Sequence, residues 1–177
     1  MKILDVDFGG TVCDNEDVPN WTPENNSLQS TLHPDQDWNG HLERPPFPGC
    51  FDVLSMLRES GFAPPGVVSK IEMLPLIQIK IRRWFVHHDR KMVIPVELIR
   101  FCGTWEEKLG LCLERRTTHF IDNQLKPLAP MVGMVPHLYL FRPPERGRDA
   151  NLWHLVESKK ITLINSWKEF GEKVLHT

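Results

Sequence analysis

Three residues at the ends of predicted strands are suited to phosphoryl chemistry. Asp7, Ser69 and Asp122 each stand at the carboxyl end of a short, mostly apolar run. The carboxyl ends of parallel strands share one edge of a sheet, and open α/β sheets bind their ligands there. Two carboxylates supply oxygen ligands that Mg²⁺ prefers, and one of them can attack phosphorus to form an aspartyl-phosphate. The three residues therefore predict a site for phosphate and Mg²⁺.

Neighbouring residues complete this predicted site. Lys108 lies early in a predicted helix, where its ammonium group can offset the charge of phosphoryl oxygens, and the Ser69 hydroxyl can bind them. The turn Gly9-Gly10-Thr11 follows Asp7, and its glycines allow a sharp bend with N–H groups free to face an anion. Lys70 is either a further phosphate contact or a solvated neighbour. The plain alternatives for Ser69 and Lys108 are an ordinary strand-end serine and a surface lysine.

Segments of helical and strand character alternate along the chain and must position these residues. Helical spacing predicts helices over Cys50–Ser60, Ile71–His88, Trp105–Arg115, Asp149–Ser158 and Ser166–Leu175. Short apolar runs predict strands over Ile3–Asp7, Gly66–Ser69, Val96–Cys102, Thr118–Asp122, Val135–Phe141 and Ile161–Asn165. This alternation predicts an α/β fold, a doubly wound and mostly parallel sheet with helices on both faces. Thr104 and Ser166 are the expected N-caps of the helices that follow them.

Length and composition fit one domain over residues 1–177. The chain is 41% hydrophobic and 25% charged, which is ordinary for a globular protein. Its net charge of -2 gives no field that would draw it to nucleic acid, and no apolar run approaches the ~18 residues of a membrane span. The start of the chain does not resemble a signal peptide, and its four scattered cysteines are expected to be thiols, so we expect a cytoplasmic protein. The oligomeric state stays open.

Residues 14–46 interrupt the alternating pattern. They are rich in Asn, Asp, Pro and Ser, contain Trp21 and Trp38, and show no periodicity. More than 30 such residues are long for a connection inside a compact domain. They are either a surface excursion that packs on the domain or a flap over the pocket.

Four motifs occur in an order that resembles the haloacid dehalogenase-like (HAD) superfamily. They are Asp7-Phe8-Gly9-Gly10-Thr11-Val12, then Ser69 after an apolar strand, then Lys108 fourteen positions before Asp122, and finally Phe120-Ile121-Asp122-Asn123. The helix start at Pro48-Gly49 is also similar to that family. The resemblance covers the chain apart from residues 14–46 and implies a capless HAD-like protein, with 14–46 as a small flap.

The resemblance also implies a role for each matching residue. Asp7 would be the nucleophile and a Mg²⁺ ligand, and the backbone carbonyl of Gly9 and the side chains of Asp122 and Asn123 would complete the metal site. The expected catalytic set is Asp7, Ser69 and Lys108. The expected phosphoryl-binding set is Gly10, Thr11, Ser69, Lys70 and Lys108.

The choice of Asp7 over Asp5 as nucleophile follows from the spacing downstream. Aligning Asp7 with the family's nucleophile keeps Gly10, Thr11 and Val12 in register without a gap. Aligning Asp5 would require an insertion of two residues before Gly10.

Gly9 is where the chain departs from the family's phosphatases. They usually carry a second aspartate two residues after the nucleophile, which protonates the leaving group and then activates water. General acid–base help of this kind is worth ~10²–10⁴ in rate. Asn123, in place of a common second acid, also reduces the negative charge around the metal. The sequence therefore predicts a Mg²⁺-dependent phosphohydrolase of phosphorylated substrates that is slowed by Gly9. The alternatives are an inactive relative that binds a phosphorylated ligand or a protein partner, or a protein that cleaves a bond other than a phosphoester.

Two further segments carry charge or imidazole groups. The basic loop Arg142–Arg148 follows a predicted strand near the same edge, and either meets negative charge on a substrate or is solvated. His87-His88-Asp89 is expected to end a helix because adjacent helical residues point about 100° apart and chelate metals poorly. His119, inside a strand, is expected to be packed or hydrogen-bonded.

Overall fold

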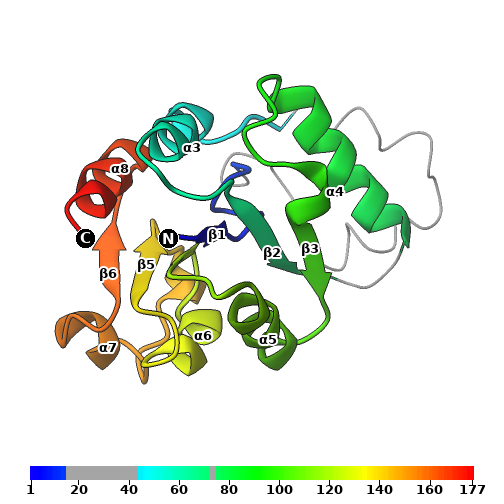
Figure 1. Ribbon diagram of the computed structural model, residues 1–177. Coiled ribbons are helices and arrows are strands. Elements are labelled where there is room, and N and C mark those ends of the chain that lie inside the picture. Colours follow the sequence, from blue (N-terminus) through cyan, green and yellow to red (C-terminus); the bar gives the residue numbers. More distant parts are fainter. Residues whose placement is uncertain (15–43, 72–74) are drawn as a thin grey trace.

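A computed structural model of the chain describes residues 1–14, 44–71 and 75–177. Six parallel strands form one sheet in the order β3-β2-β1-β4-β5-β6 (Figure 1). The strands are β1 (Leu4–Val6), β2 (Gly66–Lys70), β3 (Ile99–Cys102), β4 (His119–Asp122), β5 (His137–Phe141) and β6 (Thr162–Ile164). The predicted α/β class with a parallel sheet is confirmed.

Helices cover both faces of this sheet. They are α3 (Cys50–Glu59), α4 (Pro75–His88), α5 (Trp105–Arg115), α6 (Leu125–Leu128), α7 (His154–Glu157) and α8 (Trp167–Leu175). Helices α3 and α8 lie on one side and α5, α6 and α7 on the other (Figure 1). Each side has its own apolar cluster, one centred on residues such as Trp84 and Phe170, the other on residues such as Phe120 and Leu140. None of the described helices is long and apolar enough to cross a lipid bilayer.

Two predicted N-caps hold the helices that they begin. The Thr104 side chain accepts the Glu107 N–H over 3.1 Å, and the Glu107 carboxylate accepts the Thr104 N–H in return, which closes a capping box. The Ser166 hydroxyl accepts the Glu169 N–H over 3.1 Å at the start of α8. The first turn of α5, which carries Lys108, is therefore fixed by its own sequence.

The predicted strand over Val96–Cys102 is wrong in its first half. Residues Val96–Leu98 form a 3₁₀ turn, and β3 begins only at Ile99. The register Val67↔Ile99 would place residues 96 and 97 opposite Pro64 and Pro65. Prolines have no N–H to donate, so a strand at residues 96 and 97 would lack hydrogen-bond donors from β2.

Two predicted helices differ from the structure near their first residues. The helix expected over Asp149–Ser158 is reduced to α7, because the Asp149 carboxylate accepts the Asn151 N–H over 3.0 Å and stabilises a turn instead. The described part of α4 starts at Pro75, and Ile71, where the predicted helix starts, is not helical; residues 72–74 lie outside the described residues.

The sheet register brings the two predicted acids to one place. Val6 pairs with Ile121, and the Asp7 N–H continues this ladder by donating to the Ile121 carbonyl over 2.9 Å. Asp7 and Asp122 therefore lie side by side at the carboxyl ends of β1 and β4.

The two ends of the long connection also lie side by side. Cys13 pairs with Pro46, and the Asp14 N–H donates to the Pro45 carbonyl over 3.0 Å. Apart from these ends, the predicted flap over 14–46 lies outside the described residues. The four cysteines are buried free thiols.

His119 is buried in β4, as expected for a packed or hydrogen-bonded histidine. Its ring nitrogens lie 2.8 Å from the Thr118 hydroxyl and 3.1 Å from the Thr177 hydroxyl, and its ring stacks on His137 at 4.4 Å between centroids. Burial, with smaller contributions from the charges of His137 and Lys2, lowers its pKa from 6.5 to about 4. His119 is therefore neutral in the folded protein near pH 6.

We expect the protein to lose stability between pH 6.5 and 4 because of this residue. In that window the unfolded chain binds a proton at position 119 and the folded chain does not, so acidification favours unfolding. The pKa difference predicts a loss of about 2 kcal/mol between pH 7.5 and 5.0. Urea unfolding at both pH values should show this loss in the wild type and in His87→Gln, whose histidine is exposed. It should be smaller in His119→Gln; an unchanged pH dependence in that variant would contradict the assignment.

Candidate active site

A buried cluster of three charges stands at the carboxyl edge of the sheet. The Lys108 Nζ lies 2.8 Å from Asp7 Oδ1 and 2.5 Å from Asp122 Oδ2. The Lys108 side chain is 1% exposed, and that of Asp7 is 11% exposed. Asp122 Oδ1 also accepts the Gln124 N–H over 2.9 Å. The strand-end acids and the helical lysine thus form one constellation, although Asp7 lies 101 residues before Lys108 in the chain.

Asp122 and Lys108 both have shifted pKa values in this cluster. Burial raises the pKa of Asp122 to about 7. The negative charge of Asp7 also raises it, whereas Lys108 and the hydrogen bond from the Gln124 N–H lower it. Burial lowers the pKa of Lys108, but the Asp122 and Asp7 carboxylates outweigh this effect and hold it above its usual value. Lys108 is therefore a permanent cation that compensates for part of the carboxylate charge.

Helix α5 supplies cations to both aspartates of β1. Lys108 and Arg115 are seven residues apart, which is two helical turns, so both face the sheet. Arg115 pairs with Asp5, and the Thr117 hydroxyl donates to the same carboxylate. Asp5 is fully buried by these partners. The structure therefore gives Asp5 a set of structural contacts and leaves Asp7 at the edge of the sheet.

Arg115 and Thr117 are the partners that the sequence analysis missed. The seven-residue spacing between Lys108 and Arg115 could have indicated that both cations face the sheet. The pairing of Arg115 with Asp5 depends on the antiparallel arrangement of α5 and β1, which local patterns do not contain.

Gly10 allows the turn after β1 to approach Asn123 closely. Its φ is +76°, and a Cβ atom there would lie 2.1 Å from Asn123 Nδ2. The Trp167 indole N–H donates to the Thr11 carbonyl over 3.0 Å and anchors the same turn on α8. Any side chain at position 10 would displace the amide group of Asn123.

The prediction that this turn leaves its N–H groups free is largely wrong. The N–H groups of Thr11, Val12 and Cys13 all point to the Phe8 carbonyl, and the Gly10 N–H donates to the Cys13 carbonyl over 2.9 Å. The turn satisfies its own amides because the chain curls back on residue 8. An anion bound at this turn would therefore depend on side-chain donors more than the sequence suggested.

Several oxygen atoms beside the cluster have no hydrogen-bond partner among the described residues. Buried Thr11 Oγ1 and Asn123 Oδ1 are two of them. Asp7 accepts only the Lys108 bond there, through Oδ1, so its Oδ2 is a further unpaired acceptor. Unpaired buried oxygens are costly unless a ligand satisfies them.

These oxygens fit Mg²⁺. The described residues contain no group of three His, Cys, Asp or Glu side chains that could hold a metal ion. The available set is instead Asp7, Asp122 and the Asn123 side-chain oxygen. Mg²⁺ is commonly held by one or two carboxylates and keeps several waters, so a small all-oxygen set suits it.

Ser69 and Lys70 differ in how they relate to this cluster. Ser69 is buried on β2, beside β1, and its hydroxyl makes no hydrogen bond to the described residues. Lys70 is exposed, with its Nζ 4.6 Å from the centroid of the Trp105 ring, which also lies 5.9 Å from the Lys108 Nζ. Ser69 therefore lies at the end of a strand next to Asp7, whereas Lys70 contacts the aromatic ring at the start of α5.

Comparisons with known proteins support the fold. No protein-family model and no curated protein sequence matches the chain. Among solved structures, it is similar to the D,D-heptose 1.7-bisphosphate phosphatase from B. bronchiseptica complexed with magnesium and phosphate, with a TM-score of 0.59 and 13% identity over 99% of both chains. It is also similar to the D,D-heptose 1,7-bisphosphate phosphatase from Burkholderia thailandensis, with a TM-score of 0.57 and 12% identity over 100% of both chains. The chain therefore shares the overall fold of these two phosphatases.

Proposed function

We propose that the protein is a Mg²⁺-dependent phosphohydrolase that uses Asp7 as its nucleophile. The observation that carries this proposal is the pair of carboxylates from β1 and β4 that share one buried ammonium group, 2.8 and 2.5 Å away. The fold shared with two phosphatases, one of them complexed with magnesium and phosphate, supports the same reaction class.

In the first step, a carboxylate oxygen of Asp7 attacks phosphorus while the bond to the leaving oxygen breaks. The product is an aspartyl-phosphate, and the leaving oxygen takes a proton from water. Lys108 holds the Asp7 carboxylate in place through its 2.8 Å contact. In the second step, water attacks the phosphorus, phosphate departs and the Asp7 carboxylate is restored.

Other residues bind and orient the phosphoryl group. The hydroxyls of Ser69 and Thr11 donate to its oxygens, which explains why buried Thr11 Oγ1 has no partner among the described residues. Asp7, Asp122 and Asn123 would hold Mg²⁺, with the Gly9 carbonyl. When bound, the ion supplies charge that offsets the phosphoryl oxygens during transfer.

Gly9 restricts which substrates react quickly. With no acid at this position, the leaving group must depart with little help, so esters of acidic alcohols or phenols should react best. The same glycine favours the second candidate function, an inactive protein that binds a phosphorylated ligand. We further propose a cytoplasmic site of action, since the cysteines are all free thiols.

A turnover assay separates these two functions. We expect the full chain to hydrolyse p-nitrophenyl phosphate with Mg²⁺ and to lose this activity with EDTA, because the metal-binding carboxylates then hold only Lys108. Added Mg²⁺ in excess of EDTA should restore turnover. If no turnover occurs but beryllium fluoride, a phosphate analogue, binds tightly with Mg²⁺, the binding function replaces the enzyme. If neither occurs, both are wrong.

A further inference from the structure

A second hollow lies on the same edge of the sheet as the proposed active site. Its volume is about 270 Å³. Its walls are Arg142, Pro143, Pro144, Arg148, Leu163 and Asn165, and we call it the arginine hollow. Arg142 follows β5, which pairs directly with β4, and Asn165 follows β6. The hollow therefore stands one to two strand spacings, roughly 5–10 Å, to the side of Asp122.

The loop that carries both arginines touches the active-site edge. A Cβ atom on Gly147 would lie 2.8 Å from the carbonyl oxygen of Asn123, so the two backbones are in contact. Gly147 is buried there. The loop that lines the arginine hollow therefore borders the residue next to Asp122.

Both guanidinium groups are restrained. The Arg142 Cζ lies 5.4 Å from the centroid of Phe47, a buried ring that packs edge-on against Phe141 at 5.0 Å. The Arg148 Nε donates to the Pro143 carbonyl over 3.2 Å. Within the described part of the chain, the terminal nitrogens of Arg148 have no acceptor. A guanidinium that is already oriented loses less entropy when it binds an anion.

The lining of the hollow is positively charged. It contains two arginines and no carboxylate. The nearby Asp149 faces elsewhere, since its Oδ2 lies 4.0 Å from the Lys126 Nζ and its Oδ1 accepts the Asn151 N–H. The planar donors of arginine match the oxygens of phosphate or carboxylate groups in pairs.

We propose that the arginine hollow binds a second oxyanion of the substrate, so that the protein acts on small organic phosphates that carry a further phosphate or carboxylate group. This inference rests on the proposed function, because it assumes that the first phosphoryl group binds beside Asp7. The basic loop that the sequence left as either a substrate contact or a solvated segment then has a specific role: it selects doubly anionic ligands.

Calorimetric titration of the full chain tests this selection. An Asp7→Asn background with Mg²⁺ prevents turnover, and the probes are butyl phosphate, 1,4-butanediol bisphosphate and 4-phosphonooxybutanoate. We expect one of the doubly anionic probes to bind at least tenfold more tightly than butyl phosphate. Arg148→Gln should remove most of this ratio, and Arg142→Gln serves as an independent second variant. The doubly anionic probe whose affinity falls more in the arginine variants shows whether the hollow binds phosphate or carboxylate.

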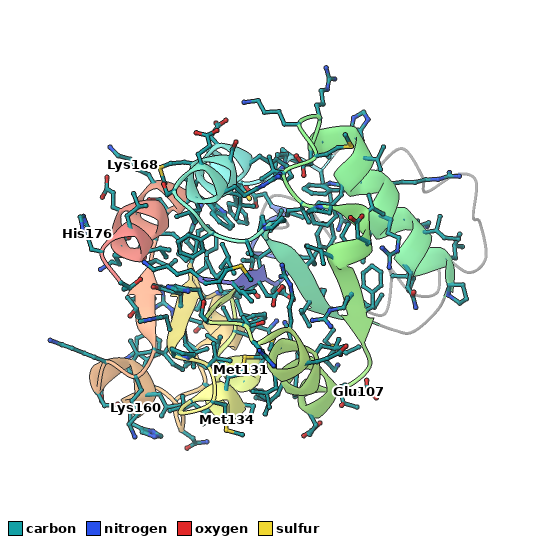
Figure 2. The ribbon with its side chains drawn as sticks, viewed as in Figure 1. Glu107, Met131, Met134, Lys160, Lys168 and His176 are labelled. Atoms are coloured by element: carbon teal, nitrogen blue, oxygen red, sulfur yellow. The ribbon has the colours of Figure 1, made fainter. Side chains whose placement is uncertain are left out.

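Lys160→Gln is the matched control because it removes the same charge at the opposite end of β6, where Figure 2 shows Lys160 beside α7. It should leave the ratio of affinities unchanged. The inference is overturned if neither doubly anionic probe binds more tightly than butyl phosphate. It is also overturned if both arginine variants weaken the binding of all three probes equally, or if Lys160→Gln lowers the ratio of affinities as much as the arginine variants do. A wild type without turnover would instead overturn the proposed enzyme and leave the affinity ratio intact, so the two failures are distinguishable.

Discussion

Asp7→Asn should reduce the turnover of p-nitrophenyl phosphate by at least about 10³-fold, because an amide does not replace a carboxylate as the nucleophile that attacks phosphorus. The change keeps the size of the side chain and an oxygen that can accept from Lys108 Nζ, which now lies 2.8 Å from Asp7 Oδ1. Initial rates with saturating Mg²⁺ measure the effect. Turnover that persists unchanged would end the assignment of Asp7 as nucleophile.

Asp5→Asn provides the matched control two residues earlier on the same strand. Asp5 is fully buried against Arg115 and Thr117, so this change should lower the free energy of unfolding by about 3 kcal/mol, the usual cost of breaking a buried ion pair. Activity per folded molecule should stay close to that of the wild type. The opposite result, with Asp5→Asn inactive and Asp7→Asn active, would show that the alignment over residues 5–11 is displaced by two.

Gly9→Asp should raise the turnover of alkyl phosphates by about 10²–10⁴-fold, because it supplies the general acid that the chain lacks. Gly9 is half-buried in the turn after Asp7, so its side chain would begin at the edge of the proposed site. The gain should be larger for alkyl than for aryl phosphates, since poorer leaving groups depend more on protonation. Comparing kcat for the two substrate types in both proteins measures this difference.

Gly9→Asn separates acid catalysis from the effect of an added side chain. Asparagine has nearly the same size as aspartate, but its amide group does not act as a general acid. We therefore expect no increase in turnover. Equal rates for the two variants, in protein that still binds Mg²⁺, would mean that the missing acid is not what limits the reaction.

Local patterns in the sequence were sufficient for the class of fold and for several helix boundaries. Alternating apolar runs and helical spacing predicted the parallel sheet, and the helix over Trp105–Arg115 has the predicted bounds. Thr104 and Ser166 form the expected caps because a cap needs only residues within one turn. Signals of this kind depend on neighbours in the chain and can be read from them.

Boundaries set by a neighbouring strand could not be read in the same way. Val96–Leu98 has the composition of a strand, yet β3 starts at Ile99 because β2 is preceded by Pro64 and Pro65 in the register that the sheet adopts. That register exists only once β2 and β3 lie side by side. Composition alone does not specify which residues will face each other.

What the sequence by itself determined was the kind of residue at each strand end, including Asp7, Ser69 and Asp122, and the spacing from Lys108 to Asp122. Only the tertiary structure decided which cation meets which acid, placing Lys108 between Asp7 and Asp122 and Arg115 on Asp5. The physical reason is that residues 7, 108 and 122 come together through the order of strands in the sheet. Strand order is a property of long-range packing, which no local pattern of residues contains.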